Sequence, residues 1–215
     1  MTDIKAVVFD SDGTLMDSHE VIIGAHEYLA RIFGAPLPSR EVIREHLSRA
    51  VPLPKILETL YPGYPLDKLL KANADYVVAR TFPTFEGVKE LLDALRKQGL
   101  LLAIVTGGDD QIHNLLAHHE LDKHFASIVH CNRVNFGKPN PEGFLLAVEE
   151  CNIRPEEAIM VGDSPNDILA GKNGKAGVTI GITHGHGSRQ DLMAADCDHI
   201  VGSSLELREQ LLVLT

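Results

Sequence analysis

The chain has 215 residues, of which 44% are hydrophobic. This length and composition fit one large domain, or a core domain with a smaller insertion, and they argue against global disorder. Thirty acidic residues against 20 basic ones give a net charge of −10, which disfavours binding to nucleic acid or to an anionic membrane. A small anionic substrate remains compatible with this charge if a metal ion or a lysine supplies local positive charge.

The N-terminal segment MTDIKAVVFD lacks the basic and apolar stretches of a signal peptide, and no apolar run approaches the length of a membrane span. The three cysteines, Cys131, Cys151 and Cys197, are widely spaced and form no CxxC pair. Their odd number and spacing argue against a disulfide framework and against a zinc site. We therefore expect free thiols and a cytoplasmic protein.

The first predicted element is a strand at residues 5–10 (KAVVFD), a short apolar run that ends in acidic and turn residues. The next segment, residues 16–80, contains helical patterns and no convincing strand. Its helices are expected at 21–33, 40–48, 55–60 and 66–80. We interpret this segment as a helical cap domain (16–80) inserted into a core domain formed by residues 1–15 and 81–215.

From residue 81 onward, predicted helices and strands alternate. Near-continuous apolar runs predict strands at 101–106, 158–162, 178–182 and 198–201, with a weaker candidate at 127–130. The spacing of apolar residues predicts helices at 86–98, 110–119, 141–151, 165–172 and 204–212. This alternation predicts an α/β fold with a doubly wound, Rossmann-like parallel sheet.

Polar residues follow several of these strands, at the positions where an open α/β sheet binds its ligands. The first group is DSDGTL, in which Asp10 ends the first strand and Asp12 follows two residues later. Two acids this close repel each other unless a cation or a proton lies between them, and Mg²⁺ prefers such oxygen ligands. One carboxylate suits nucleophilic attack and the other suits proton transfer, although Asp-Gly alone is also common in ordinary turns.

Three further groups supply candidates for binding phosphate and metal. Thr106 and the backbone amide of Gly107 follow the strand LLAIVT and can hold phosphate oxygens, although a Gly-Gly loop alone is a weak signal. Lys138, in FGKP, can neutralise phosphate charge, although a lone lysine is usually solvent-exposed. Asp163 and Asp167, in GDSPND, lie one helical turn apart and can approach one metal ion; a helix N-cap and an exposed helix acid are the alternative interpretation.

These motifs resemble, in order and spacing and over nearly the whole chain, those of the haloacid dehalogenase-like hydrolase superfamily. DSDGTL resembles the first motif, Thr106 the second, Lys138 the third and GDSPND the fourth, and phosphoglycolate phosphatase-like members with a helical cap are the nearest type. The resemblance implies a Mg²⁺-dependent phosphatase that acts on a small phosphomonoester through an aspartyl-phosphate intermediate. It implies a small phosphorylated substrate. From the net charge we expect no nucleic-acid or membrane partner, and we expect a monomer or dimer.

The resemblance also implies roles for the four acids. Asp10 would be the nucleophile and a metal ligand. Asp12 would protonate the leaving oxygen and then activate water, and its backbone carbonyl would contact the metal. Asp163 would be a further Mg²⁺ ligand, and Asp167 would support the ion directly or from the second shell.

Phosphate would be bound by Thr106 and the Gly107 amide, and Lys138 would steady the phosphoryl group. Two positions depart from the usual family pattern. Ser11 stands where a large apolar residue is common between the two acids, and Gly107 stands where many related members have asparagine. Cap residues should select the substrate, and Arg49 is a candidate for contacting the leaving group, although a solvated helix surface is the alternative.

Other activities on the same scaffold stay open. A sugar-phosphate mutase would keep the aspartyl phosphate but return the phosphoryl group to a bound sugar. The resemblance speaks against a dehalogenase, which would lack the acid that Asp12 supplies. A phosphonate hydrolase would need a reactive cap lysine, and none of Lys55, Lys68 and Lys71 is compelling. For His184 and His186, in THGHGS, we expect a polar loop and no metal site, because no nearby acid or cysteine completes a ligand set.

Overall fold

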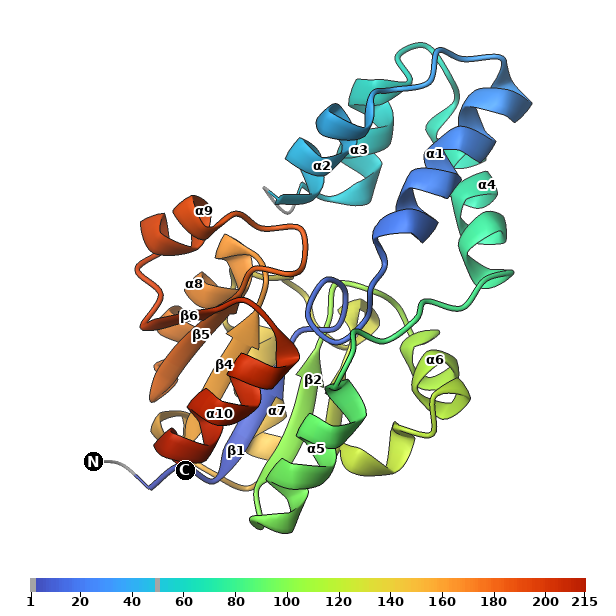
Figure 1. The fold of residues 1–215 in the computed structure, drawn as a ribbon. Coiled ribbons are helices and arrows are strands. Elements are labelled where there is room, and N and C mark those ends of the chain that lie inside the picture. The colour runs from blue at the N-terminus through green and yellow to red at the C-terminus, as the bar shows by residue number, and fades with distance from the viewer. Residues whose placement is uncertain (1–2, 49–50) are drawn as a thin grey trace.

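A six-stranded parallel sheet forms the centre of the computed structural model, which describes residues 3–48 and 51–215 (Figure 1). The strands are β1 (Ala6–Phe9), β2 (Leu101–Val105), β3 (Ser127–Val129), β4 (Ala158–Gly162), β5 (Val178–Ile182) and β6 (His199–Val201). Their order in the sheet is β3-β2-β1-β4-β5-β6, and every neighbouring pair is parallel. The predicted α/β fold with a doubly wound parallel sheet is confirmed, and the weaker strand candidate is β3.

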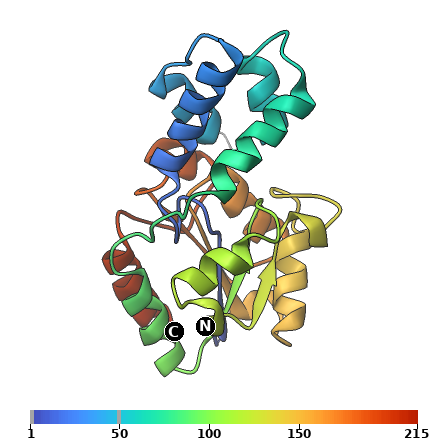
Figure 2. The ribbon, with the colours of Figure 1, turned by 90° about the vertical axis from the view of Figure 1, so that its right-hand side faces the viewer.

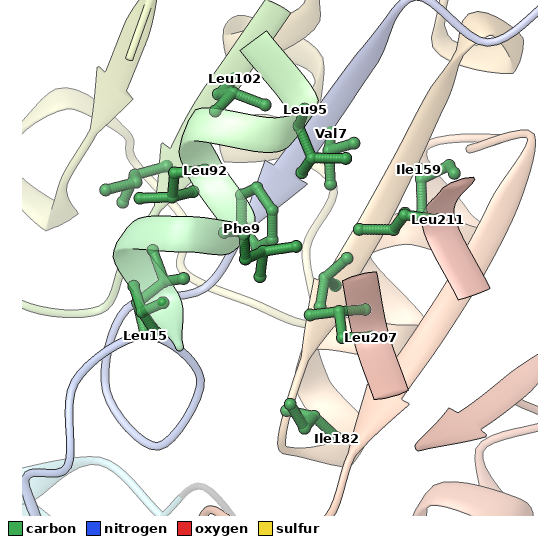
Figure 3. Packing of buried hydrophobic residues seen from close by; sticks show 14 of the residues in the cluster. Val7, Phe9, Leu15, Leu92, Leu95, Leu102, Ile159, Ile182, Leu207 and Leu211 are labelled. Atoms are coloured by element: carbon green, nitrogen blue, oxygen red, sulfur yellow. The ribbon is translucent and has the colours of Figure 1, made fainter. Parts of the chain in front are cut away.

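Helices cover both faces of this sheet because successive strand residues point to opposite sides. Val7 and Phe9 of β1 face a core cluster that includes Leu92 of α5 and Leu211 of α10 (Figure 3). Ala6 and Val8 face the other cluster, which α7 completes with Phe144, Ala147 and Val148. The core helices are α5 (Val88–Lys97), α6 (Ile112–His118), α7 (Glu142–Glu150), α8 (Pro165–Asn173), α9 (Arg189–Ala194) and α10 (Ser204–Leu214).

One core helix, α9, was missing from the prediction. It has only six residues, which is too short for apolar periodicity to show, and the segment before it reads as a polar loop. The helix begins at Ser188, whose hydroxyl accepts a hydrogen bond from the backbone N–H of Asp191. Its apolar contact is Leu192, which packs against Ile168 of α8.

The remaining helices lie between β1 and β2 in the sequence and stand beyond the sheet as a separate group (Figures 1 and 2). We call them the cap helices: α1 (His19–Phe33), α2 (Arg40–Ser48), α3 (Leu53–Leu60) and α4 (Leu66–Val78). They have an apolar cluster of their own around Leu29, Leu57, Tyr61 and Leu69. The domain boundaries 1–15, 16–80 and 81–215 stay a prediction.

The two ends of α1 differ in how they are capped. Gly34 ends the helix with φ 66°, a left-handed conformation that glycine adopts without strain. Ser18 stands at the N-cap position, but its side chain makes no capping hydrogen bond.

Within the described part of the chain, no helix combines the length and apolar character needed to cross a bilayer. All three cysteines are free, as expected.

Candidate active site

The carboxyl ends of β1 and β4 bring two acids to one edge of the sheet. Asp10 directly follows β1, and Asp163 directly follows β4, the parallel neighbour of β1. The backbone N–H of Asp10 still donates to the carbonyl of Val161, 2.8 Å away, so the carboxylate leaves the sheet at a fixed point. Both side chains are buried. The sequence therefore places these two carboxylates side by side through strand pairing alone.

Lys138 joins the acids of two different motifs. Its ammonium pairs with Asp10 Oδ1 and, at 2.5 Å, with Asp167 Oδ1. It also donates to the carbonyl of Val105, 3.1 Å away at the end of β2. The side chain is only 13% exposed, so it is not the solvated surface lysine of the alternative interpretation.

Asp167 serves the fold and the site at once. It lies in the first turn of α8, where its Oδ2 accepts from the backbone N–H of Ser164 at 3.0 Å and from the Ser164 hydroxyl at 2.6 Å. This capping box fixes the start of α8 and aims the other oxygen, Oδ1, at Lys138. A Cβ on Gly162 would lie 2.2 Å from the Asp167 Cβ, so the strand end must be glycine for the acid to fit.

Asp163 is held by the loop at residues 183–188, for which the sequence predicted only a polar loop. The backbone N–H of His186 donates to Asp163 Oδ2 at 2.6 Å. A Cβ at Gly185 would lie 2.3 Å from the same carboxylate, and one at Gly187 would lie 1.8 Å from the Asp163 carbonyl oxygen. The two glycines flanking a histidine were the available signal for this close approach. The Nε2 atom of His184 forms a hydrogen bond with the Thr14 carbonyl oxygen, 3.0 Å away. Among the described residues, His184 is not part of the group of possible metal ligands.

The first motif turns sharply after Asp10. Gly13 has φ 79°, and a Cβ there would meet Asp163 Oδ2 at 2.1 Å, so this turn requires glycine. Thr14 Oγ1 donates to Asp10 Oδ2 at 3.4 Å. Asp12 is half-buried beside this turn. Burial raises the pKa of Asp12, while the charge of Lys138 and a hydrogen bond with Ser18 act in the opposite direction.

Charge at the site is unbalanced. Burial raises the pKa of Asp10 to about 7, with the nearby Asp167 and Asp12 adding to the effect and Lys138 opposing it. Burial and the charges of Asp10 and Asp167 raise the pKa of Asp163 well above its usual range. Burial alone would lower the pKa of Lys138, but its two carboxylate partners outweigh burial and raise it. The ammonium is therefore charged, and the acids around it would hold more negative charge than it neutralises once all of them are ionised.

This donor set fits a hard divalent cation. Asp10, Asp163 and Asp167 each offer a carboxylate oxygen, and these oxygens lie within 4.8 Å of one another. When all three acids are ionised, three carboxylates against one ammonium leave two negative charges in a buried site, and oxygen ligands of this kind suit Mg²⁺. Among the described residues, the Asp12 carboxylate is outside this group. Its predicted contact with the metal is through the backbone carbonyl, and that contact stays a prediction.

The metal-free protein should lose stability as pH rises, and Mg²⁺ should restore it. Asp10 and Asp163 have pKa values above those of the unfolded chain, so their protonated forms favour the fold. The contribution of Asp10 is lost as pH rises through its pKa of about 7, and that of Asp163 is also lost as pH rises. Melting scans with a chelator or with Mg²⁺ should therefore show a larger gain from Mg²⁺ near pH 8 than near pH 5. An equal gain at both pH values would contradict the charge imbalance, and Asp163→Asn should abolish most of the gain.

The predicted phosphate-binding residues lie next to this group. Thr106 follows β2 and is buried, and its Oγ1 accepts from the backbone N–H of Gly108 at 3.0 Å. This contact folds the Gly107–Gly108 turn over the hydroxyl and leaves Gly107 exposed. Arg49, the predicted cap contact, lies outside the described residues.

Comparison with known proteins identifies the family of the chain. The family model of haloacid dehalogenase-like hydrolases matches residues 4–175, so the chain belongs to that hydrolase family. The phosphoglycolate phosphatase of Vibrio parahaemolyticus serotype O3:K6 is 29% identical and covers 96% of each chain. The putative pyrophosphatase PpaX of Caldanaerobacter subterraneus subsp. tengcongensis is 36% identical over 79% of this chain and 78% of its own.

A solved structure shares the arrangement of the whole chain. The putative beta-phosphoglucomutase from Thermotoga maritima superposes with a TM-score of 0.81 and 26% identity, covering 99% of this chain and 100% of its own. The family resemblance seen in the motifs is thus confirmed, together with the fold.

Proposed function

We propose that the chain is a Mg²⁺-dependent phosphatase that hydrolyses a small phosphomonoester of the phosphoglycolate type. The observation that carries the proposal is the Asp10 carboxylate, which follows β1, contacts the Lys138 ammonium and lies beside two further buried carboxylates. Asp10, Asp163 and the Asp12 carbonyl would hold Mg²⁺, with Asp167 in direct or water-mediated support. When bound, the ion supplies positive charge that offsets the negative charge of the phosphoryl group.

The reaction proposed has two steps. An oxygen of Asp10 attacks phosphorus, the ester P–O bond breaks, and Asp12 gives its proton to the leaving oxygen. A water oxygen then attacks the phosphorus of the aspartyl phosphate, Asp12 takes a proton from that water, and inorganic phosphate leaves with Asp10 restored. Lys138 stays charged throughout and stabilises the extra negative charge of each transition state.

The remaining roles concern orientation and access. Thr106 and the Gly107 amide would hold phosphate oxygens, since they directly follow β2, the strand next to β1. Residues 16–80 would act as a cap domain over the core formed by 1–15 and 81–215, with Arg49 as a candidate contact for the leaving group. The cytoplasmic location and a monomeric or dimeric state belong to the same proposal.

A phosphate-release screen tests this function. Wild type and the Asp10→Asn variant are compared on phosphoglycolate, sugar phosphates, nucleotides and pyrophosphate, with Mg²⁺ or with a chelator. We expect Mg²⁺-dependent release from a small monoester by wild type alone. Release by both proteins, or release that survives the chelator, would contradict the proposal.

A sugar-phosphate mutase is the second candidate, and the likeness to the Thermotoga maritima structure favours it. A mutase would convert one sugar phosphate into its isomer while releasing little free phosphate. Measuring the sugar isomers alongside phosphate in the same screen separates the two activities.

A further inference from the structure

The loop that carries Lys138 is bound to the start of helix α7 through the carboxylate of Glu142, the first residue of that helix. Its Oε1 accepts from the backbone N–H of Asn135 at 3.0 Å and from the side-chain amide of the same residue at 2.9 Å. Its Oε2 accepts from the backbone N–H of Phe136 at 2.9 Å. Since Lys138 follows two residues after Phe136, these bonds fix the chain just before it delivers the lysine to the site.

The turn that contains Lys138 is also held from α8. The backbone N–H of Asn140 donates to the carbonyl of Gly137 at 3.1 Å, so the lysine lies inside a hydrogen-bonded turn. The side-chain amide of Asn173, at the end of α8, donates to the carbonyl of Pro139 at 3.1 Å. These contacts hold the part of the loop that follows the lysine, whereas the carboxylate on α7 holds the part that precedes it.

The start of α7 is itself placed against the strand that Lys138 contacts. Gly143, next to Glu142, packs so closely on the end of β2 that a Cβ there would lie 2.8 Å from Val105 Cγ1. The carbonyl of Val105 accepts from the Lys138 ammonium at 3.1 Å. The helix start and the ammonium thus share one reference point. A shift of the loop relative to α7 therefore moves the ammonium relative to the site.

Apolar packing does little to hold this loop. Residues 135–137 are exposed, and the side chain of Phe136 is 64% exposed. The apolar cluster on this face of the sheet takes in Val134 before the loop and Phe144 after it. Lys138 itself is only 13% exposed. A buried cation is therefore carried by an exposed loop, and polar contacts such as those of the carboxylate must set its place.

We propose that Glu142 is a positioning residue for Lys138, because its carboxylate holds the part of the loop that precedes the lysine. The ammonium is thereby kept in contact with Asp10 and Asp167. The proposal rests on the proposed function, in which this ammonium stabilises negative charge on the phosphoryl group. Glu142 acts only through the loop and the lysine, and it does not touch the substrate.

Kinetics separate positioning from a general loss of structure. We expect Glu142→Ala to lower kcat/KM for phosphate release roughly 10-fold, since displacing a catalytic group by about 1 Å can cost about 10²-fold. In the Lys138→Met background the same change should cost less than about twofold, because the group that it positions is gone. An unchanged kcat/KM in Glu142→Ala would overturn the proposal. An equal loss in both backgrounds would also overturn it, since Glu142 would then support the site as a whole.

Two variants serve as controls. Glu149→Ala makes the same change near the other end of α7, at an exposed residue, and should leave kcat/KM within about twofold of wild type. Glu142→Asp keeps the negative charge in the first turn of the helix but shortens the side chain by one CH₂ group, so it should lose nearly as much activity as Glu142→Ala. Full activity in Glu142→Asp would mean that charge at the helix start matters and not the reach of the carboxylate. That result, or an equal loss in Glu149→Ala, would refute the positioning role.

Two measurements on the metal-free protein need no activity. Exchange of the backbone amide hydrogens of Asn135 and Phe136, followed by NMR, should become faster in Glu142→Ala and stay unchanged in Glu149→Ala. Near pH 8, Lys138→Met should lower the melting temperature less in the Glu142→Ala background than in wild type, because a displaced ammonium contributes less through its ion pairs. Unchanged exchange, or an equal fall in melting temperature in both backgrounds, would contradict the proposal.

These measurements also keep the two proposals apart. If exchange and melting temperatures are as expected and wild type releases no phosphate from any ester, the proposed function fails, whereas the placement of Lys138 by Glu142 stands as a feature of the fold. If wild type is an active phosphatase and the falls in melting temperature are equal, the proposed function stands and the placement of the lysine by Glu142 is refuted.

Discussion

Replacing Asp10 by asparagine should lower kcat for phosphate release by at least about 10³-fold, since an amide oxygen is a far weaker nucleophile than a carboxylate. The substitution keeps the size of the side chain and the backbone hydrogen bond to Val161, so the fold should survive. Steady-state phosphate release and circular dichroism of the same preparations check both statements.

Asp122→Asn is the matched control for this variant. Asp122 is exposed in the 3₁₀ turn Asp122–His124, and the same change of charge there should leave kcat within about twofold of wild type. Near-normal turnover by the Asp10 variant would remove Asp10 as the nucleophile. An equal loss in both variants would point to charge in general and not to the site.

Lys138→Met should have the next largest effect, and it should act on both activity and stability. The variant keeps much of the side-chain volume but removes the cation between Asp10 and Asp167. We expect kcat/KM to fall about 10²–10³-fold, because the phosphoryl charge loses a fixed partner. We expect unfolding free energy to fall by about 2–4 kcal/mol near pH 8, since buried carboxylates are left without their partner.

The loss of stability in Lys138→Met should depend on pH. Near pH 5, below its pKa of about 7, Asp10 is protonated, so the loss of its partner Lys138 should cost less stability there. Denaturant titrations at both pH values measure the difference. Lys123→Met, at an exposed lysine, should change stability little at either pH. A loss that is equal at both pH values would contradict the role assigned to the lysine.

Local pattern was enough to predict the sheet and most helices. Apolar runs such as AVVF and AIMVG are buried on both faces and can hardly be anything but central parallel strands. The helix α9 escaped because six residues give no period, and its only firm anchor, Leu192, packs on a helix distant in sequence. Whether a helix could be predicted from the sequence therefore depended on its length and not on how well it packs.

The site was predictable where its residues end strands and unpredictable where they approach through loops. Asp10 and Asp163 follow neighbouring strands, so the strand order alone brings them together. The contact between His19 and His186 joins positions 167 residues apart, and no spacing rule foresees it. The same holds for the loop around His186, whose glycines pack closely against Gly13 and Asp163.

The dual use of Asp167 shows a further limit of motif reasoning. A carboxylate three residues after a serine at a helix start fits a capping box, and the same carboxylate after an acidic strand end fits a metal site. Both descriptions hold here, because one oxygen accepts from Ser164 and the other contacts Lys138. Only the geometry of the second oxygen separates a structural acid from a participant in the site.

Trapping the covalent intermediate tests the nucleophile most directly. The Asp12→Asn variant, incubated with Mg²⁺ and p-nitrophenyl phosphate, can still lose a good leaving group but lacks the base for hydrolysis, so a phosphoryl group should accumulate on Asp10. Borohydride reduces an acyl phosphate to an alcohol, and peptide mass spectrometry should then find homoserine in place of aspartate at position 10. Unmodified Asp10 in all peptides despite a burst of p-nitrophenolate, or a label on another residue, would contradict catalysis by Asp10.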